Sequence, residues 1–173
     1  MTHHRRRNNG TDPSKINETV ELSPAQRYAA FKQTQAKQRT VAAEFARSMP
    51  FELDEFQMQA NDALEAGDNV LVAAPTGAGK TVAADFAIYL AQTRNVKAFY
   101  TTPIKALSNQ KYHDLVDQYG TDKVGLLTGD TSINSEADIV VMTTEVLRNM
   151  LYEHSVTLEA LRYVILDEVH YLA

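Results

Sequence analysis

The chain has 173 residues, of which 44% are apolar and 23% are charged, and it contains no cysteine. This is the composition of a globular domain with enough apolar material for a core, and it excludes disulfide scaffolds, cysteine-ligated metals and thiol nucleophiles. No apolar run approaches the roughly 18 residues that a membrane-spanning helix needs. The basic start leads into a polar stretch, so we expect a cytoplasmic protein without a secretory signal.

The net charge of −5 is unevenly distributed along the chain. Residues 1–50 carry a net charge of +5, whereas residues 51–173 carry −10. A basic arm on an acidic body suits a nucleic-acid tether, and a solvated tail explains the same charges. Residues 1–22 are polar and lack apolar periodicity, so we expect a disordered basic tail there.

A helical extension is expected next, over residues 23–49. Ser23 has the character of an N-cap, a proline follows at the first helical position, and Gln26 completes a capping box. The apolar stripe of this helix is thin, and the helix is expected to continue to about Arg47. The dipeptide Met49-Pro50 ends it, because a residue before proline disfavours helical backbone.

From residue 51 onward, helical patterns alternate with short apolar strands. Helices are expected over residues 53–66, 80–92, 105–119 and 144–152, and strands over residues 69–73, 97–101, 124–127, 138–142 and 162–166. This alternation is typical of an α/β fold with a mostly parallel sheet flanked by helices.

The stretch Ala-Pro-Thr-Gly-Ala-Gly-Lys-Thr, residues 74–81, stands between an expected strand and an expected helix, which is the setting of a phosphate-binding P-loop. Gly77 and Gly79 allow successive N–H groups to point at a phosphate, and the helix N-terminus adds positive charge. Lys80 would hold the β- and γ-phosphates, and the Thr81 hydroxyl would bind Mg²⁺. The other loop residues expected at the nucleotide are Pro75, Thr76 and Ala78. The general pattern starts with glycine rather than alanine, and a plain glycine turn is the alternative.

An acidic doublet, Asp167-Glu168, follows the last expected strand. Ligands of parallel sheets bind at the carboxyl ends of the strands. Asp167 would hold Mg²⁺, and Glu168 would orient or deprotonate the attacking water, because neighbours on an extended chain point to opposite sides. Capping of a following helix is the alternative. With the P-loop, the doublet predicts ATP hydrolysis.

These motifs resemble those of the superfamily 2 DEVH-box helicases. Residues 102–111, 125–130 and 142–148 narrow the resemblance to the superkiller-like RNA helicases, in particular the actinobacterial HelY type. The resemblance covers residues 50–173 and implies the first RecA-like ATP-binding domain of such an enzyme. It implies that the domain is incomplete and truncated after the Asp-Glu strand, so that a central strand between that strand and the P-loop strand, an arginine finger and the C-terminal helicase domain are missing.

The resemblance implies further site residues. Phe51 would stack on adenine and Gln57 would bond the edge of the base; the alternative places Phe51 in the core or in a helix staple, and Gln57 on the surface. His170 would couple the nucleotide site to the rest of the motor, or serve as a structural histidine. Residues at strand-to-helix and strand-to-strand turns would contact the nucleic-acid backbone: Thr102, Pro103, Lys105, Gly129, Asp130, Thr143, Thr144 and Glu145. Helix capping by the threonines and a solvated Lys105 are the alternatives.

The sequence therefore predicts the N-terminal part of an ATP-dependent RNA helicase, with ATP and Mg²⁺ as cofactors and single-stranded RNA, or DNA, as partner. Hydrolysis and unwinding are expected to need the second domain, so the chain alone is expected to be inactive. Two alternatives remain: another P-loop ATPase, such as a DNA translocase or remodelling motor, and an inactive fragment that holds nucleic acid through Arg5, Arg6 and Arg7.

Overall fold

The structure is a computed structural model that describes residues 23–75, 77–153 and 155–172. The tail expected over residues 1–22 lies outside this description. The chain divides into two compact units, one up to Gln38 and one from Arg39 onward. In the first unit, α1 (Pro24–Gln38) begins with the expected capping box. Gln26 Oε1 accepts a hydrogen bond from the Ser23 N–H at 2.8 Å, and Ser23 Oγ accepts one from the Gln26 N–H at 3.3 Å.

The second unit holds the remaining elements, which follow the expected alternation of helices and strands. In chain order they are α2 (Val41–Ser48), α3 (Glu55–Ala66), α4 (Thr81–Thr93), β1 (Lys97–Thr102), α5 (Lys105–Tyr119), β2 (Val124–Thr128), β3 (Thr131–Ile133), β4 (Ile139–Thr143), α6 (Thr144–Tyr152), the 3₁₀ helix η1 (Val156–Leu158), β5 (Leu161–Leu166) and the 3₁₀ helix η2 (Val169–Leu172). The short strand β3 was not expected.

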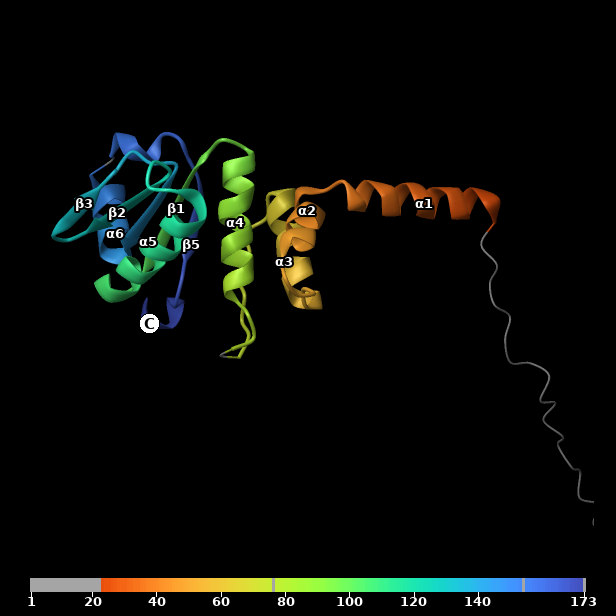
Figure 1. Cartoon of the computed structure of the whole chain (residues 1–173), viewed down its shortest axis with the longest axis horizontal. Helices are drawn as coiled ribbons and strands as arrows, with labels where there is room; N and C mark the ends of the chain where they lie inside the picture. Colours follow the sequence, from red (N-terminus) through yellow and green to blue (C-terminus); the bar gives the residue numbers. More distant parts are fainter. Residues whose placement is uncertain (1–22, 76, 154, 173) are drawn as a thin grey trace, which may run out of the picture. The chain divides into compact units, whose positions relative to one another are not determined.

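The sheet has the strand order β3-β2-β4-β1-β5 (Figure 1). Strands β2, β4, β1 and β5 pair in parallel, and β3 pairs antiparallel with β2. The expected α/β fold with a mostly parallel sheet is therefore confirmed. All four parallel strands end at the same edge of the sheet, which places the turns after them together.

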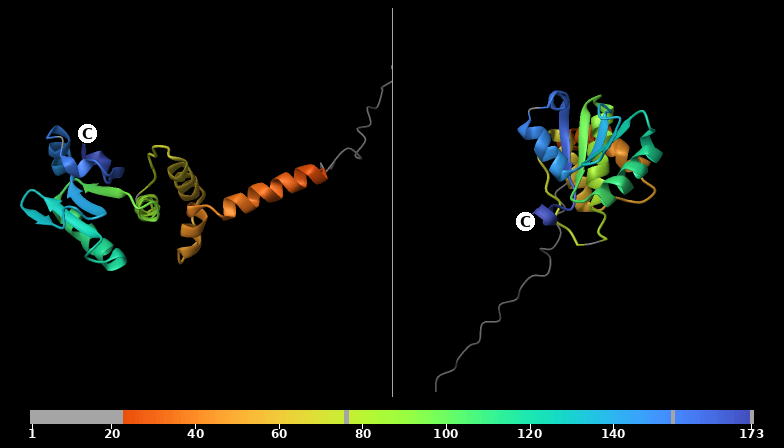
Figure 2. Two further views of the ribbon diagram at one scale, coloured as in Figure 1. Left: turned by 90° about the horizontal axis from the view of Figure 1, so that it is seen from above. Right: turned by 90° about the vertical axis from the view of Figure 1, so that its left-hand side faces the viewer.

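Helices cover the two faces of this sheet. On one face, Ile88 of α4 and Leu115 of α5 pack against Tyr100 of β1. On the other face, Leu147 of α6 packs in a cluster with Phe99 of β1 and with β4. The right-hand view of Figure 2 shows α5 and α6 on opposite sides of the strands. Side chains that alternate along β1 thus fill two separate core layers.

Helices α2 and α3 pack on the side of α4. Phe45 of α2 is 1% exposed, and its ring centroid lies 5.2 Å from that of Phe86 and 5.4 Å from that of Tyr89. At the far end of α4, Arg94 donates hydrogen bonds to the Tyr163 hydroxyl and to the Glu65 carbonyl oxygen. These contacts fix α3, and with it the chain that leads into the P-loop, against the sheet.

The prediction of one continuous helix to about Arg47 was wrong. Between α1 and α2, Thr40 has extended backbone (φ −75°, ψ 155°), and its Oγ1 accepts a hydrogen bond from the Ala43 N–H at 3.1 Å. The carboxylate of Glu65 accepts hydrogen bonds from the first two N–H groups of α2. The helix restarts here because a threonine cap and a carboxylate from α3 satisfy N–H groups that a continuous helix would bond internally.

The strand expected over residues 69–73 was also wrong. Residues 68–75 have no regular structure, and Leu71 is 81% exposed. Strand β5 is the edge of the described sheet, with Val164 45% and Leu166 47% exposed. An apolar run forms a strand only when a neighbouring strand bonds it.

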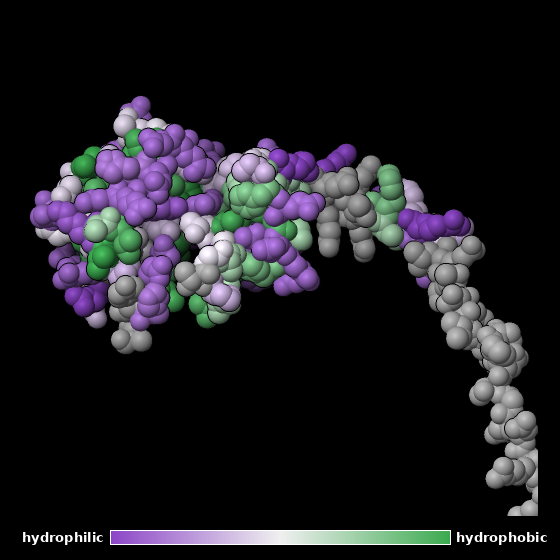
Figure 3. Space-filling model, turned by 60° about the horizontal axis from the view of Figure 1, so that its bottom comes forward, coloured by the Kyte–Doolittle hydropathy of each residue, from purple (hydrophilic) through white to green (hydrophobic). Residues whose placement is uncertain are grey.

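Among the described residues, no helix has both the length and the apolar character needed to cross a membrane. The face of the larger unit drawn in Figure 3 is mainly hydrophilic, with separate apolar patches.

Candidate active site

The P-loop residues form a glycine-dependent turn immediately before α4. Gly77 and Gly79 have φ angles of +83° and +75°, which L side chains rarely adopt. Lys80 Nζ donates a hydrogen bond to the Ala74 carbonyl oxygen at 2.8 Å and so closes the turn. Thr81 is the first residue of α4, where the helix N-terminus attracts anions. Thr76, also expected here, lies outside the described residues.

Gln57 connects α3 to this turn. Its side chain is buried, with only 4% of the residue exposed. Gln57 Oε1 accepts a hydrogen bond from the Asp54 N–H at 2.8 Å, and Nε2 donates one to the Gly79 carbonyl oxygen at 3.0 Å. The alternative of a surface glutamine is therefore wrong. Both polar ends of the amide are used inside the protein, one at the start of α3 and one at the P-loop.

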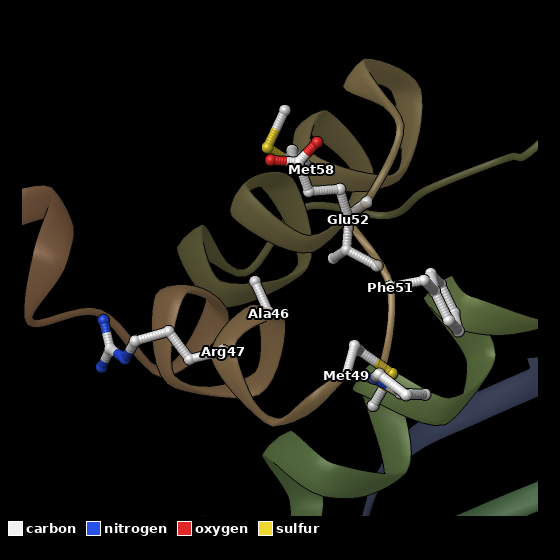
Figure 4. Close-up of a pocket in the computed structure, with 8 residues that line it drawn as sticks. Ala46, Arg47, Met49, Phe51, Glu52 and Met58 are labelled. Atoms are coloured by element: carbon white, nitrogen blue, oxygen red, sulfur yellow. The ribbon is translucent and has the colours of Figure 1, made fainter.

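Phe51 lies elsewhere, on a hollow beside α3. It is 52% exposed, so the alternative that it belongs to the core is wrong. The hollow has a volume of about 650 Å³, and Figure 4 shows that its walls come from the end of α2, the following linker and α3. Its lining residues are Ala46, Arg47, Met49, Pro50, Phe51, Glu52, Leu53 and Met58. The aromatic ring is thus available for stacking, next to a mainly apolar surface.

The acidic doublet stands at the carboxyl end of β5. The Asp167 N–H donates to the Thr101 carbonyl oxygen at 3.0 Å, which extends the pairing with β1. Asp167 Oδ2 accepts a hydrogen bond from the Tyr100 hydroxyl at 2.7 Å, and Oδ1 accepts one from the Glu168 N–H at 2.9 Å. Glu168 itself has a φ of +54°, a rare conformation for a residue with a side chain. The sharp turn at Glu168 lets the two adjacent carboxylates take different directions.

His170 lies next to the second carboxylate. Its Nδ1 is 3.1 Å from Glu168 Oε2, and both side chains are substantially exposed. The pair is a full ion pair only when the imidazole is protonated. The structure thus brings two of the predicted site residues into contact within one turn of chain.

Tyr100 is a site residue that the sequence reasoning missed. It is 1% exposed, and burial raises the pKa of its phenol, an effect that the hydrogen bond to Asp167 reinforces. It therefore stays protonated and acts as a donor. Lys111 Nζ lies 4.9 Å from the centroid of the Tyr100 ring and 2.8 Å from Asp85 Oδ1 of α4. The sequence offered one signal of this contact, a tyrosine within an apolar strand, because a buried phenol needs a hydrogen-bond partner.

The turns expected to contact nucleic acid lie side by side at the same sheet edge. The register pairs Thr102 with Thr143, and Thr144 Oγ1 donates to the Thr102 carbonyl oxygen at 3.2 Å. Thr102 Oγ1 also lies 2.7 Å from Ser108 Oγ of α5. Pro103 follows Thr102 in the first of these turns, and Glu145 is exposed in the first turn of α6. Figure 1 and the right-hand view of Figure 2 show the P-loop and the chain after β5 at this end of the unit.

Lys105 and Asp130, predicted as separate contacts, are bonded to each other. Lys105 Nζ lies 2.7 Å from Oδ1 and 2.6 Å from Oδ2 of Asp130. The hydrogen bond from Lys105, with others from Thr128 and Thr131, lowers the pKa of the Asp130 carboxyl below its ordinary value. Gly129 precedes Asp130 in the turn between β2 and β3 and has open space around its Cα. The Asp130 carboxylate therefore offsets the positive charge of Lys105, whose side chain is partly exposed.

The residues present fit a magnesium nucleotide. Mg²⁺ prefers oxygen ligands and takes only one or two of them from protein, with phosphates and water supplying the rest. The Thr81 hydroxyl and the Asp167 carboxylate are oxygen donors of this kind. Within residues 23–75, 77–153 and 155–172, no group of three or more His, Cys, Asp or Glu side chains could hold a metal by itself.

A mostly parallel sheet flanked by helices, with a glycine turn before α4 and an acidic doublet at the end of β5, defines a P-loop domain of RecA-like fold. Residues 54–173 match the DEAD/DEAH box helicase family, so the chain belongs to that family. The chain is 61% identical over 129 residues to a probable HelY helicase of Mycobacterium tuberculosis, covering 75% of this chain and 14% of that protein. It is 52% identical over 127 residues to the antiviral helicase SKI2 of Saccharomyces cerevisiae, covering 73% and 10%.

Solved structures agree with this assignment of fold. A hypothetical ATP-dependent RNA helicase from Sulfolobus tokodaii superposes with a TM-score of 0.57 at 28% identity, covering 76% of this chain and 42% of that one. The helicase MrfA, bound to DNA and AMPPNP, superposes with a TM-score of 0.61 at 28% identity, covering 76% and 21%. The relatives and the fold agree on a helicase-family domain, which spans only a small part of the length of these relatives.

Proposed function

We propose that the chain is the first ATP-binding domain of an ATP-dependent RNA helicase, which binds ATP with Mg²⁺ and the backbone of single-stranded RNA. One observation carries the proposal: the edge of the parallel sheet where β5 ends in the doublet Asp167-Glu168 lies at the same end of the unit as the glycine turn closed by Lys80. That edge is where ligands of such sheets bind.

The roles of the phosphate-site residues follow from their chemistry. The backbone N–H groups from Gly77 to Thr81, in the turn and at the start of α4, would surround the phosphates, and Lys80 would exchange the Ala74 carbonyl for a phosphate oxygen. The Thr81 hydroxyl and the Asp167 carboxylate would hold Mg²⁺, which when bound neutralises negative charge on the phosphates. Glu168 would accept a proton from the water that attacks the γ-phosphorus as the bond to ADP breaks.

The nucleobase would be recognised upstream of the P-loop. The exposed ring of Phe51 can stack on adenine, whereas Gln57 already bonds the Gly79 carbonyl oxygen. To bond the base edge, the amide would have to exchange one of its two protein partners. Gln57 would then link the presence of the base to the position of the P-loop backbone.

The RNA backbone would lie across the turns that follow β1 and β4. These turns present helix N-termini and threonine hydroxyls, which bind phosphates without reading base sequence. RNA as partner is supported by the DExH11 relative of Arabidopsis thaliana, named an ATP-dependent RNA helicase and 50% identical over 129 residues, covering 75% of this chain and 9% of that protein. The DNA bound to MrfA favours DNA as the second candidate.

The test measures ATP turnover by the full-length protein with RNA or DNA present. Glu168→Gln is expected to abolish turnover while ATP binding persists, because the amide cannot accept the proton. Glu159→Gln, on an exposed turn before β5, is the matched control and should leave turnover unchanged. Substantial turnover in Glu168→Gln overturns the role of Glu168, and stimulation by DNA alone overturns the assignment to RNA.

A further inference from the structure

Tyr100 stands in the centre of β1 with its ring inside the core. Its aromatic ring packs in the cluster that contains Ile88 of α4 and Leu115 of α5. Its hydroxyl donates a hydrogen bond to Asp167 Oδ2 at 2.7 Å. A phenol buried to 1% exposure makes such a bond because the alternative is an unsatisfied buried donor.

The carboxylate of Asp167 is held from both oxygens. Oδ2 accepts from Tyr100, and Oδ1 accepts from the Glu168 N–H at 2.9 Å. Each carboxylate oxygen can accept a second interaction, so both keep a direction free for a metal or for water bound to it. Two donors at fixed positions therefore determine the plane and the outward direction of the group.

A second pair of side chains holds the tyrosine ring in place. Lys111 Nζ lies over the ring at 4.9 Å from its centroid and 2.8 Å from Asp85 Oδ1. The Lys111 side chain is 14% exposed and that of Asp85 is 33% exposed, so the ion pair and the cation–π contact are both partly shielded from water. Asp85 is on α4, one helical turn after Thr81. The Lys111–Asp85 ion pair therefore connects the Tyr100 ring to the helix that follows the P-loop.

We infer that Tyr100 is a positioning residue for the magnesium-binding carboxylate of Asp167, and that the Lys111–Asp85 pair locks this tyrosine to the P-loop helix. The inference rests on the proposed function, because it requires Asp167 to hold the metal. Loss of the hydroxyl leaves the ring packing intact and frees the carboxylate to rotate. The specific consequence is a weaker contribution of Mg²⁺ to nucleotide binding.

The experiment compares the affinity of a fluorescent, non-hydrolysable ATP analogue in Mg²⁺ with its affinity in EDTA, using the full-length protein. In Tyr100→Phe, the ratio of the two affinities is expected to fall about three- to tenfold, the size of the net contribution of one ordinary hydrogen bond, while the affinity in EDTA is unchanged. Tyr119→Phe is the control, because Tyr119 packs against the same core and its hydroxyl is bonded by Gln118 instead. It should keep the wild-type ratio.

Two further variants separate positioning from stability. In an Asp167→Asn background, Tyr100→Phe should have no additional effect on the ratio. Lys111→Met, which keeps the apolar stem, should lower the ratio by a smaller factor than Tyr100→Phe. If Tyr100→Phe no longer unfolds cooperatively with temperature, the affinity ratio of Lys111→Met becomes the test. A wild-type affinity ratio in Lys111→Met would then overturn the inference.

The remaining outcomes are distinguishable. An unchanged ratio in Tyr100→Phe, or an equal loss of affinity in Mg²⁺ and in EDTA, overturns the inference and leaves the proposed function standing. If the wild-type protein binds no nucleotide under either condition, the proposed function fails and the inference fails with it.

Discussion

The side-chain amide of Gln57 donates a hydrogen bond to the carbonyl oxygen of Gly79 at 3.0 Å, across 22 residues of chain. The other end of the same amide accepts from the Asp54 N–H at the start of α3. One buried side chain thus joins a helix cap to the glycine turn. Its removal leaves two backbone groups without their partner, which has consequences for both stability and nucleotide binding.

Gln57→Ala is expected to lower the free energy of unfolding by about 1–3 kcal/mol, because the Asp54 N–H and the Gly79 carbonyl, both in partly buried hydrogen bonds, lose their partner. It should also weaken ATP binding and reduce the preference for ATP over GTP. Urea unfolding and competition binding measure the two effects. Gln59→Ala is the control, because Gln59 is exposed on the same helix and its side chain donates a hydrogen bond to the carboxylate of Glu55, four residues away. Equal effects of the two substitutions would contradict the bridging role.

The two glycines of the turn should respond differently to alanine. A Cβ on Gly79 would lie 2.6 Å from Gln57 Nε2, whereas a Cβ on Gly77 would meet nothing within 4 Å. Gly77→Ala carries only the strain of a positive φ, about 1–2 kcal/mol. Gly79→Ala carries the same strain and the clash, so its loss of thermal stability and of ATP affinity should be larger.

The double variant Gln57→Ala/Gly79→Ala tests the origin of that difference. With the amide gone, the added methyl group has room, so the double variant should lose less than the sum of the two single losses in unfolding free energy. Strict additivity would show that the close approach of Gln57 to Gly79 is not the cause.

Glu65 is expected to stabilise the junction of α2 and α3. Its carboxylate accepts from the Val41 N–H at 3.0 Å and from the Ala42 N–H at 2.7 Å. Charge-assisted bonds at a helix N-terminus predict a loss of about 1.5–3 kcal/mol for Glu65→Ala in urea unfolding. Glu55→Ala, in the exposed first turn of α3, serves as the control and should cost less than about 1 kcal/mol. Similar losses would refute the capping role.

The acid titration of Asp130 should report its bond to Lys105. Because the folded-state pKa of this carboxyl is lowered, its stabilising contribution is present above the ordinary pKa of about 3.9 and is lost as the pH falls through the folded value. In Lys105→Gln, the midpoint should rise toward the ordinary value, as measured by carboxyl-carbon NMR. Glu136, whose pKa is lowered by Lys97, is the internal control and should not move. An unchanged Asp130 midpoint would show that Lys105 is not its partner in solution.

Local signals in the sequence predicted most of the elements. The helices over 105–119 and 144–152 were predicted with their observed bounds. A glycine follows the first of these helices, and a strand precedes the second. The glycine turn before α4 and the doublet after β5 were also predicted from sequence alone. These features depend on backbone preferences within a few residues, which the local sequence carries.

Two of the failures, the strand over residues 69–73 and the continuous helix to about Arg47, involve contacts between segments that are distant in the sequence. Residues 69–73 have the apolar composition of a strand, yet a strand forms only where a neighbouring strand bonds it, and no strand of the described sheet pairs with these residues. The break at Thr40 depends partly on Glu65, a residue of another helix. Such partners cannot be read from a local pattern.

By itself, the sequence determined the alternation of helices and strands, the glycine turn and the acidic doublet. These features depend on residue spacing and on the backbone preference of each residue, which are local properties of the sequence. Only the tertiary structure decided that Gln57 bonds Gly79, that Lys105 meets Asp130 and that Tyr100 reaches Asp167. Those pairings arise when parallel strands end at one edge and buried polar groups must find partners across the fold, and sheet register and side-chain burial settle which groups meet.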